Sequence, residues 1–361
     1  MDSLIVSAES KEYPIYFTSD FSGLCHACKE ADLKKTKAFI VSDSSVSEIY
    51  MAEVKKELEG YFSEVCEIVF EAGERNKNID TMCYIYGRLL EERAERKSTV
   101  FALGGGVCGD MTGFAAATYL RGIKFVQIPT SLLAQVDSSV GGKVGIDFKE
   151  SKNMIGAFYQ PEFVYINTDT LKTLPEAEFQ AGMAEVVKYG PIASVQLYDF
   201  LWENKEEIKK LDTDVISEMI KKCCEIKAAV VSEDEKEAGL REILNFGHTI
   251  GHAVESVMNF KYLHGQCVAI GMSAVMEMCV KRGYISEQCA EIFRALLKEF
   301  GLELTVNGID AQSIYKQMFN DKKVKDNKIS FVLVSRFGET YRTTDVTEEE
   351  ILDGINYILG E

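Results

Sequence analysis

Three of the four histidines in this 361-residue chain fall close together, between positions 248 and 264. His248 and His252 lie four residues apart in NFGHTIGHAVE, and His264 follows in YLHGQ. Side chains at i and i+4 share one face of a helix, so both imidazoles can reach the same ion. Spacing alone therefore predicts a zinc ion held by three histidines, although the same spacing also occurs on helix faces that bind nothing.

A carboxylate offers a second choice of ligands. The segment AGMAEVVKYG places Glu185 and Lys188 three residues apart on a predicted helix. A carboxylate can replace one histidine at zinc and leave that histidine free for acid–base chemistry. The residues alone leave both sets of ligands open.

A glycine-rich turn follows an apolar segment in STVFALGGGVCGDMTG. Gly104, Gly106 and Gly109 fit the pattern G-x-G-x-x-G between a predicted strand and a predicted helix. Such a turn lets the backbone approach a pyrophosphate at the helix N-terminus. The acidic residue usually found roughly 20 residues later is absent, and Asp43 at the end of AFIVSD is the alternative ribose partner. A tight turn without a ligand fits the pattern as well.

The segment 129–161 is dense in polar residues and is expected to be a loop between two strands. It contains Gly141-Gly142-Lys143 and Lys152-Asn153. Ammonium groups and free backbone N–H groups beside glycines suit the binding of phosphate or carboxylate. The alternative is a solvated loop with ordinary surface charges.

The elements that must position these residues alternate in the first half of the chain. Helical patterns at 44–62 and 78–96 separate short β-branched or aromatic segments. The predicted strands are 13–18, 37–43, 66–71, 98–105, 125–130 and 163–168. This alternation predicts an α/β, Rossmann-like domain with a mostly parallel sheet, helices on both faces and ligands at the carboxyl ends of the strands.

The second half is different in character. Its periodicity is nearly all helical to about residue 320, and a hairpin at 328–344 and a last helix follow. We therefore expect an α/β domain over 1–172 and a mainly helical domain over 173–361.

Composition limits the classes of function. The net charge of −17 argues against a nucleic-acid partner, and no apolar run reaches the roughly 18–20 residues of a membrane helix. Ten irregularly spaced cysteines indicate reduced thiols in the cytoplasm. The pair Cys25-x-x-Cys28 is expected to be part of a packed helix and not a metal or redox site. An acidic protein that binds an anion needs a local cluster of lysine and arginine.

Six motifs together resemble the 3-dehydroquinate synthase family of sugar phosphate cyclases. They are LGGGVCGDMTGFAAATYLRG, IPTSLLAQVDSSVGGKVGID, SKNMIGAFYQP, GMAEVVKYG, LREILNFGHTIGHAVE and LHGQCVAIGM, and they span nearly the whole chain. The resemblance implies a lyase of the shikimate pathway of aromatic amino acid biosynthesis. Such an enzyme converts 3-deoxy-D-arabino-heptulosonate 7-phosphate to 3-dehydroquinate and phosphate. The steps are NAD-dependent oxidation, β-elimination of phosphate, re-reduction and intramolecular aldol closure.

The resemblance also implies roles for individual residues. It assigns a divalent metal ion, zinc first and cobalt as the alternative, to Glu185, His248 and His264, with His252 as a site residue and not a ligand. Arg121 would reach the substrate phosphate of a neighbouring subunit, which implies a homodimer. The other substrate and catalytic positions are Asp137, Lys143, Asn153, Lys188, Lys227, Arg241, Asn245, His252 and one of Lys322 or Lys323. The NAD positions are Asp43, Glu74, Lys77, Gly105, Gly106, Val107, Asp110, Thr130, Ser131, Lys143, Lys152, Thr173, Leu174 and Glu178.

Three other functions compete with this interpretation. One is another sugar phosphate cyclase that makes deoxy-scyllo-inosose or an epi-valiolone, and another is a metal-dependent polyol dehydrogenase that releases NADH. The third is a non-catalytic NAD- or zinc-binding protein. Lys227, Arg241 and Asn245 favour a substrate with a carboxylate, and hence 3-dehydroquinate.

Overall fold

A computed structural model describes the chain except for residues 150, 260, 320–323, 326–327 and 361. The described residues form two units. Unit 1 comprises Met1–Leu174 and Ile216–Lys236, and unit 2 comprises Pro175–Val215 and Glu237–Glu361. The sequence predicted that the chain passes from one domain to the other once, near residue 173. In the structure the chain leaves unit 1 after Leu174, but a second segment, 216–236, also belongs to unit 1.

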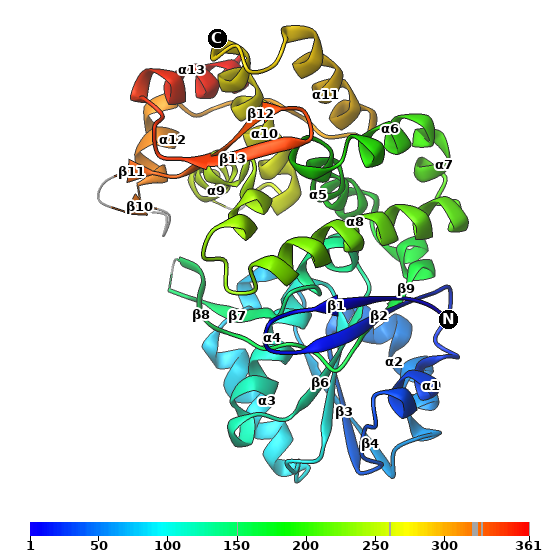
Figure 1. The fold of residues 1–361 in the computed structure, drawn as a ribbon. Helices are drawn as coiled ribbons and strands as arrows, with labels where there is room; N and C mark the ends of the chain where they lie inside the picture. Colours follow the sequence, from blue (N-terminus) through cyan, green and yellow to red (C-terminus); the bar gives the residue numbers. More distant parts are fainter. Residues whose placement is uncertain (150, 260, 320–323, 326–327, 361) are drawn as a thin grey trace. The chain divides into compact units, whose positions relative to one another are not determined.

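A seven-stranded sheet is the centre of unit 1 (Figure 1). Its order is β1-β2-β9-β6-β5-β3-β4, and every neighbouring pair is parallel except β1 and β2. The strands are β1 (Asp2–Ser7), β2 (Glu12–Thr18), β3 (Lys37–Asp43), β4 (Glu64–Phe70), β5 (Thr99–Gly104), β6 (Lys124–Pro129) and β9 (Val164–Asn167). The six predicted strands are confirmed, and β1 is an additional edge strand.

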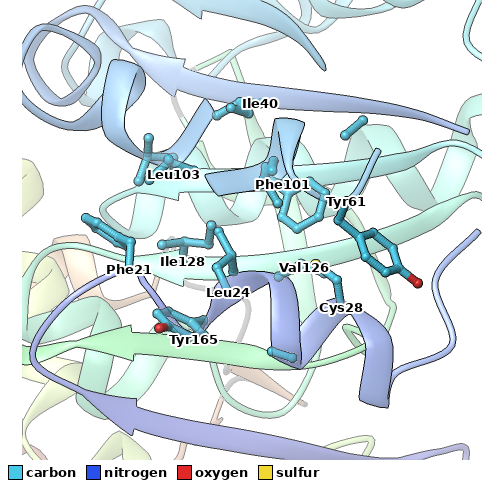
Figure 2. Close-up of a cluster of buried hydrophobic side chains, with 14 of the residues drawn as sticks. Phe21, Leu24, Cys28, Ile40, Tyr61, Phe101, Leu103, Val126, Ile128 and Tyr165 are labelled. Atoms are coloured by element: carbon cyan, nitrogen blue, oxygen red, sulfur yellow. The ribbon is translucent and has the colours of Figure 1, made fainter. Parts of the chain in front are cut away.

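Helices cover both faces of this sheet, as the α/β pattern predicted. They are α1 (Leu24–Glu30), α2 (Ser44–Glu59), α3 (Ile79–Glu91) and α4 (Gly106–Thr118). Phe101 and Leu103 of β5 point into one apolar cluster, with Leu24 and Cys28 of α1 (Figure 2). Val100 and Ala102 of the same strand belong to the cluster on the opposite face. A strand buried on both faces is apolar at every position, which is why β5 is a continuous apolar run.

The segment with the two cysteines is helical, as predicted. Cys28 is buried in the core, and burial raises the pKa of its thiol. Cys25 donates a hydrogen bond of 2.7 Å to the backbone oxygen of Glu57. All ten cysteines have free thiols.

The expectation of a loop over 129–161 is wrong. The segment contains the π-helical turn η3 (Ala134–Ser138) and an antiparallel hairpin of β7 (Lys143–Phe148) and β8 (Ser151–Phe158). The side chain of Val144 lies against Gly113 of α4, where an added Cβ would collide with it. The hairpin therefore packs closely on the helix that follows the glycine turn.

Unit 2 is mainly helical, as predicted, and helix α10 (His264–Lys281) is buried along most of its length. The helix α8 (Thr213–Glu233) begins in unit 2 and continues into unit 1. The other helices are α5 (Glu176–Ala193), α6 (Val195–Glu203), α7 (Lys205–Lys209), α9 (His248–Val257), α10 (His264–Lys281), α11 (Glu287–Glu299), α12 (Ala311–Met318) and α13 (Glu348–Leu359). The predicted hairpin is present as β12 (Phe331–Arg336) and β13 (Glu339–Thr343), preceded by the short strands β10 (Val324–Lys325) and β11 (Lys328–Ile329). Among the helices that the structure describes, none is long and apolar enough to cross a membrane.

Candidate functional site

Glycines bring three helices of unit 2 close together. A Cβ on Gly265 of α10 would collide with the backbone oxygen of Ala181 in α5, and one on Gly251 of α9 would lie 2.8 Å from the backbone oxygen of Cys267. Only glycine permits backbones to approach this closely. As a result, Glu185 of α5 meets the histidines of α9 and α10.

The distances in this cluster suit a tetrahedral metal ion. One carboxylate oxygen of Glu185, Oε1, lies 3.5 Å from Nε2 of His248 and 3.5 Å from Nε2 of His264. Zinc bonds of about 2.0–2.2 Å at tetrahedral angles separate two ligand atoms by about 3.3–3.6 Å. The two separations from Glu185 therefore match two edges of a tetrahedral site.

The three imidazoles also gather around one point. Ring centroids of His248, His252 and His264 are 5.4 to 5.6 Å apart, and one ring nitrogen of each lies within 4.8 Å of the others. The three histidines that spacing predicted as ligands therefore also lie close enough together to be considered as a metal site. Glu185 is favoured because both of its 3.5 Å separations match a tetrahedral edge.

The electrostatics of the cluster favour a cation. The Glu185 and Lys188 side chains are each 1% exposed, and the Lys188 ammonium contacts Oε2 of Glu185. Burial lowers the pKa of His264, but the carboxylates of Glu185 and Glu255 outweigh it and raise this pKa to about 9. Without an ion, a proton on His264 thus supplies positive charge, and a metal ion would displace it.

Glu255 is a further buried carboxylate beside the cluster, and it was not among the predicted residues. It is 4% exposed, and its Oε2 lies 3.6 Å from Nδ1 of His264. The signal was present in the sequence, because His248, His252 and Glu255 stand at i, i+4 and i+7 on one face of α9.

The predicted nucleotide turn lies at the carboxyl edge of the sheet in unit 1. Asp43 ends β3 and caps α2, where its Oδ1 accepts hydrogen bonds of 3.0 Å from the amides of Ser45 and Val46. Strand β5 pairs with β3, so Asp43 lies beside the glycine turn, with Oδ2 3.2 Å from the position of a Cβ on Gly104. The structure therefore brings Asp43 to the turn, as the alternative ribose partner requires.

Other predicted NAD positions surround the same turn. The Ser131 hydroxyl lies 3.3 Å from the position of a Cβ on Gly105, and the Thr130 amide donates to the oxygen of Gly104 at 3.0 Å. Gly106 and Val107 begin α4. Farther along the chain, the Thr173 hydroxyl is 2.5 Å from that of Tyr50.

A buried ion pair connects three of the predicted residues in unit 1. The ammonium of Lys77, a residue that is 4% exposed, donates hydrogen bonds of 2.6 Å to Asp110 and 2.6 Å to Asn153. Burial lowers the pKa of Lys77, but the carboxylates of Asp110 and Glu74 outweigh it and raise this pKa. Lys152 forms an ion pair of 3.2 Å with Glu74.

A second pair joins residues far apart in the sequence. The ammonium of Lys227 on α8 contacts the carboxylate and the backbone oxygen of Asp137 on η3. Both residues belong to unit 1. Lys143, at the start of β7, is exposed.

The remaining predicted residues lie in different places. Arg241 is buried in unit 2, and the side-chain amide of Asn245 donates to Glu237 at 3.1 Å. Arg121 is exposed on the surface of unit 1. Leu174 ends the first segment of unit 1, and Glu178 lies in the first turn of α5. Lys322 and Lys323 fall outside the described residues.

Comparison with known proteins gives a consistent result. Residues 67–181 match the family model for the 3-dehydroquinate synthase N-terminal region, and residues 182–324 match the model for its C-terminal region. The 3-dehydroquinate synthase of Acetivibrio thermocellus is 49% identical over 362 aligned residues, which cover 100% of both chains.

Solved structures of similar fold are more distant in sequence. A 2-deoxy-scyllo-inosose synthase complexed with carbaglucose-6-phosphate, NAD+ and Co2+ has a TM-score of 0.87 at 25% identity and covers 99% of this chain and 100% of its own. A 2-epi-5-epi-valiolone synthase from Streptomyces hygroscopicus subsp. jinggangensis, with NAD+ and Zn2+ bound, has a TM-score of 0.88 at 23% identity, with 96% and 97% covered.

Proposed function

Because the chain belongs to the 3-dehydroquinate synthase family, we propose that it converts 3-deoxy-D-arabino-heptulosonate 7-phosphate to 3-dehydroquinate and phosphate. In this proposal it is a carbon–oxygen lyase of the shikimate pathway. The observation that carries the chemistry is the position of the Glu185 carboxylate, 3.5 Å from a nitrogen of each of two histidines. The sugar phosphate cyclases that make other products share the fold at only 25% and 23% identity, against 49% for a dehydroquinate synthase.

We propose that the cofactors are NAD and one divalent metal ion, since two structural relatives contain NAD+ with Co2+ or Zn2+. The metal ligands would be Glu185, His248 and His264. One carboxylate and two imidazoles form a typical catalytic zinc site with a position left open for substrate. When bound, the ion supplies Lewis acidity to substrate hydroxyls, and NAD supplies a reversible hydride acceptor.

The chain's own residues then have two tasks. Lys188 contacts Glu185, and His252 lies beside the other two imidazoles, which supports the proposal that both move protons at substrate hydroxyls. Lys143, Lys227 and Arg241 would hold the carboxylate and phosphate of the substrate. Lys227 and Arg241 are buried, where an ion pair with an anion is stronger than in water.

The proposed assembly is a homodimer in which Arg121 reaches the neighbouring subunit's substrate. Leu120 and Arg121 are exposed and both have positive φ, 51° and 67°, a conformation that non-glycine residues seldom adopt. Strained exposed residues often belong to functional sites. Mixing inactive R121A with inactive H264A should restore part of the activity, because one site of each mixed dimer is then intact. Activity that stays absent in mixed dimers argues against a shared site.

The proposed location is the cytoplasm, because all ten cysteines have free thiols, which is typical of a reducing compartment.

The decisive experiment uses catalytic NAD with the heptulosonate phosphate. A synthase should release phosphate in large molar excess over NAD, and absorbance from NADH should not accumulate, because the oxidised intermediate is reduced again before release. Formation of NADH in proportion to substrate, without phosphate, would identify a polyol dehydrogenase instead. Product analysis by mass spectrometry would distinguish dehydroquinate from the other cyclase products.

A further inference from the structure

We propose that Glu255 is a positioning residue, which turns the His264 ring so that Nε2, and not Nδ1, faces the metal ion. This inference rests on the proposed function, because it takes Glu185, His248 and His264 as the ligands. Glu255 itself would not touch the ion. It would act through the nitrogen of His264 that the ion leaves unused.

The two nitrogens of His264 face two different carboxylates. Nε2 lies 3.5 Å from Glu185 and Nδ1 lies 3.6 Å from Glu255. A neutral imidazole carries its proton on one nitrogen and a lone pair on the other. A carboxylate beside Nδ1 holds the proton there, so the lone pair of Nε2 is directed toward Glu185 and the ion.

His248 is oriented in the same way by a different acceptor. Its Nδ1 lies 3.1 Å from the backbone oxygen of Phe246, and its Nε2 faces the same oxygen of Glu185. The backbone immediately before α9 therefore orients His248. His264 begins α10, and it receives its acceptor from a side chain of α9.

The burial of Glu255 supports a role in the site. Its side chain is 5% exposed, and a buried carboxylate is costly unless a cation or a strong donor lies beside it. A residue on this face of α9 that served packing alone would be apolar. A carboxylate behind a ligand histidine also increases the basicity of the ring and the affinity for the metal.

The first test uses the wild-type protein loaded with zinc and labelled with 15N in histidine. The His264 signals, assigned by comparison with H264A, should show a proton on Nδ1 and zinc on Nε2. The Nδ1 proton should exchange with water more slowly in the wild type than in E255A. Zinc on Nδ1 of His264 would overturn the inference, whether or not any variant folds.

The second test measures zinc affinity by competition with a chromophoric chelator. E255A should bind zinc about 10- to 100-fold more weakly than the wild type. E255Q should lose less, because the amide keeps an oxygen acceptor for Nδ1–H at nearly the same volume. The control is E277A, which removes a carboxylate of α10 that is 13% exposed and pairs with Arg294 at 3.1 Å.

The outcomes separate the inference from the proposed function. Wild-type affinity in E255A would overturn the inference, and so would an equal loss in E255A and E277A. If E255A does not fold, the zinc affinity of E255Q is compared with that of H264A. Glu255 is proposed to act only through His264, so a zinc affinity of E255Q below that of H264A would contradict an orienting role. If the wild type itself binds no zinc, the proposed metal site fails. If it binds zinc through other ligands, H264A keeps the metal.

Discussion

Removal of the Lys77 ammonium tests whether the predicted nucleotide site is built around a buried ion pair. Lys77 donates hydrogen bonds of 2.6 Å to Asp110 and to Asn153, and the side chains of Lys77 and Asp110 are 5% and 18% exposed. Burial raises the pKa of Asp110, and the charge of Lys77 is the largest influence that lowers it. In K77M the carboxyl group would lose its counter-ion in a place that water scarcely reaches.

The expected cost follows from these contacts. Two hydrogen bonds to or from charged groups contribute about 1.5–3 kcal/mol each, and breaking one side of a buried pair costs about 3–5 kcal/mol. For a domain of the size of unit 1, each kcal/mol lowers the unfolding midpoint by about 2–4 °C. We therefore expect K77M to lower the midpoint of unit 1 by about 6–20 °C and to weaken NAD binding.

The assay is a double-mutant cycle followed by calorimetry. K77M, D110N and the double variant are compared, and the double variant should lose at least about 1 kcal/mol less than the sum of the single losses. The matched control is K55M, which breaks an exposed ion pair with Glu67 of 2.8 Å and should cost less than about 1 kcal/mol. Additive losses, or a K77M loss no larger than that of K55M, would refute the reasoning.

Three further predictions concern unit 2. E185A should strip zinc from the protein while H252A retains it, measured by metal analysis after dialysis; zinc lost in H252A but kept in E185A would favour the all-histidine site. Chelation of zinc should lower the unfolding midpoint seen by fluorescence of Trp202, the only tryptophan, which lies in unit 2. Zinc at 100 times its dissociation constant contributes about 2.7 kcal/mol, so an unchanged midpoint argues against the site. Hydrogen bonds from Arg282 lower the pKa of Glu350 to about 2. Urea unfolding should therefore show E350Q to be less stable than the wild type, with the full difference above about pH 4.5. That difference should disappear as the pH falls toward 2.

The strands of unit 1 were predictable because burial determines their composition. Strands such as β3 and β5 are buried along most of their length and therefore appear as apolar runs between polar residues. The hairpin of β7 and β8 was missed for the opposite reason. No position of β8 is fully buried, so its sequence has no apolar periodicity to detect.

The histidine cluster shows where spacing stops being informative. Spacing correctly located the histidines, but it could not choose between His252 and Glu185 as the third ligand. That choice depends on the close approach of α5 and α10 at Gly265, which no local pattern reveals. The resemblance to the family supplied Glu185, and the 3.5 Å distances now give a geometric reason to prefer it.

Lys227 shows a limit that better local analysis would not remove. It stands in a helix of the half of the chain that was expected to form the helical domain, and its sequence neighbours give no sign of another location. Its ammonium contacts Asp137, a residue 90 positions earlier, and α8 continues into unit 1 before the chain returns to unit 2. The buried lysine therefore belongs to the unit that carries the nucleotide turn, while Arg241 and Asn245 belong to the unit that carries the histidines. Assignment of basic residues to a domain by their order in the sequence fails wherever a helix is shared in this way, because burial and ion pairing depend on contacts between distant segments.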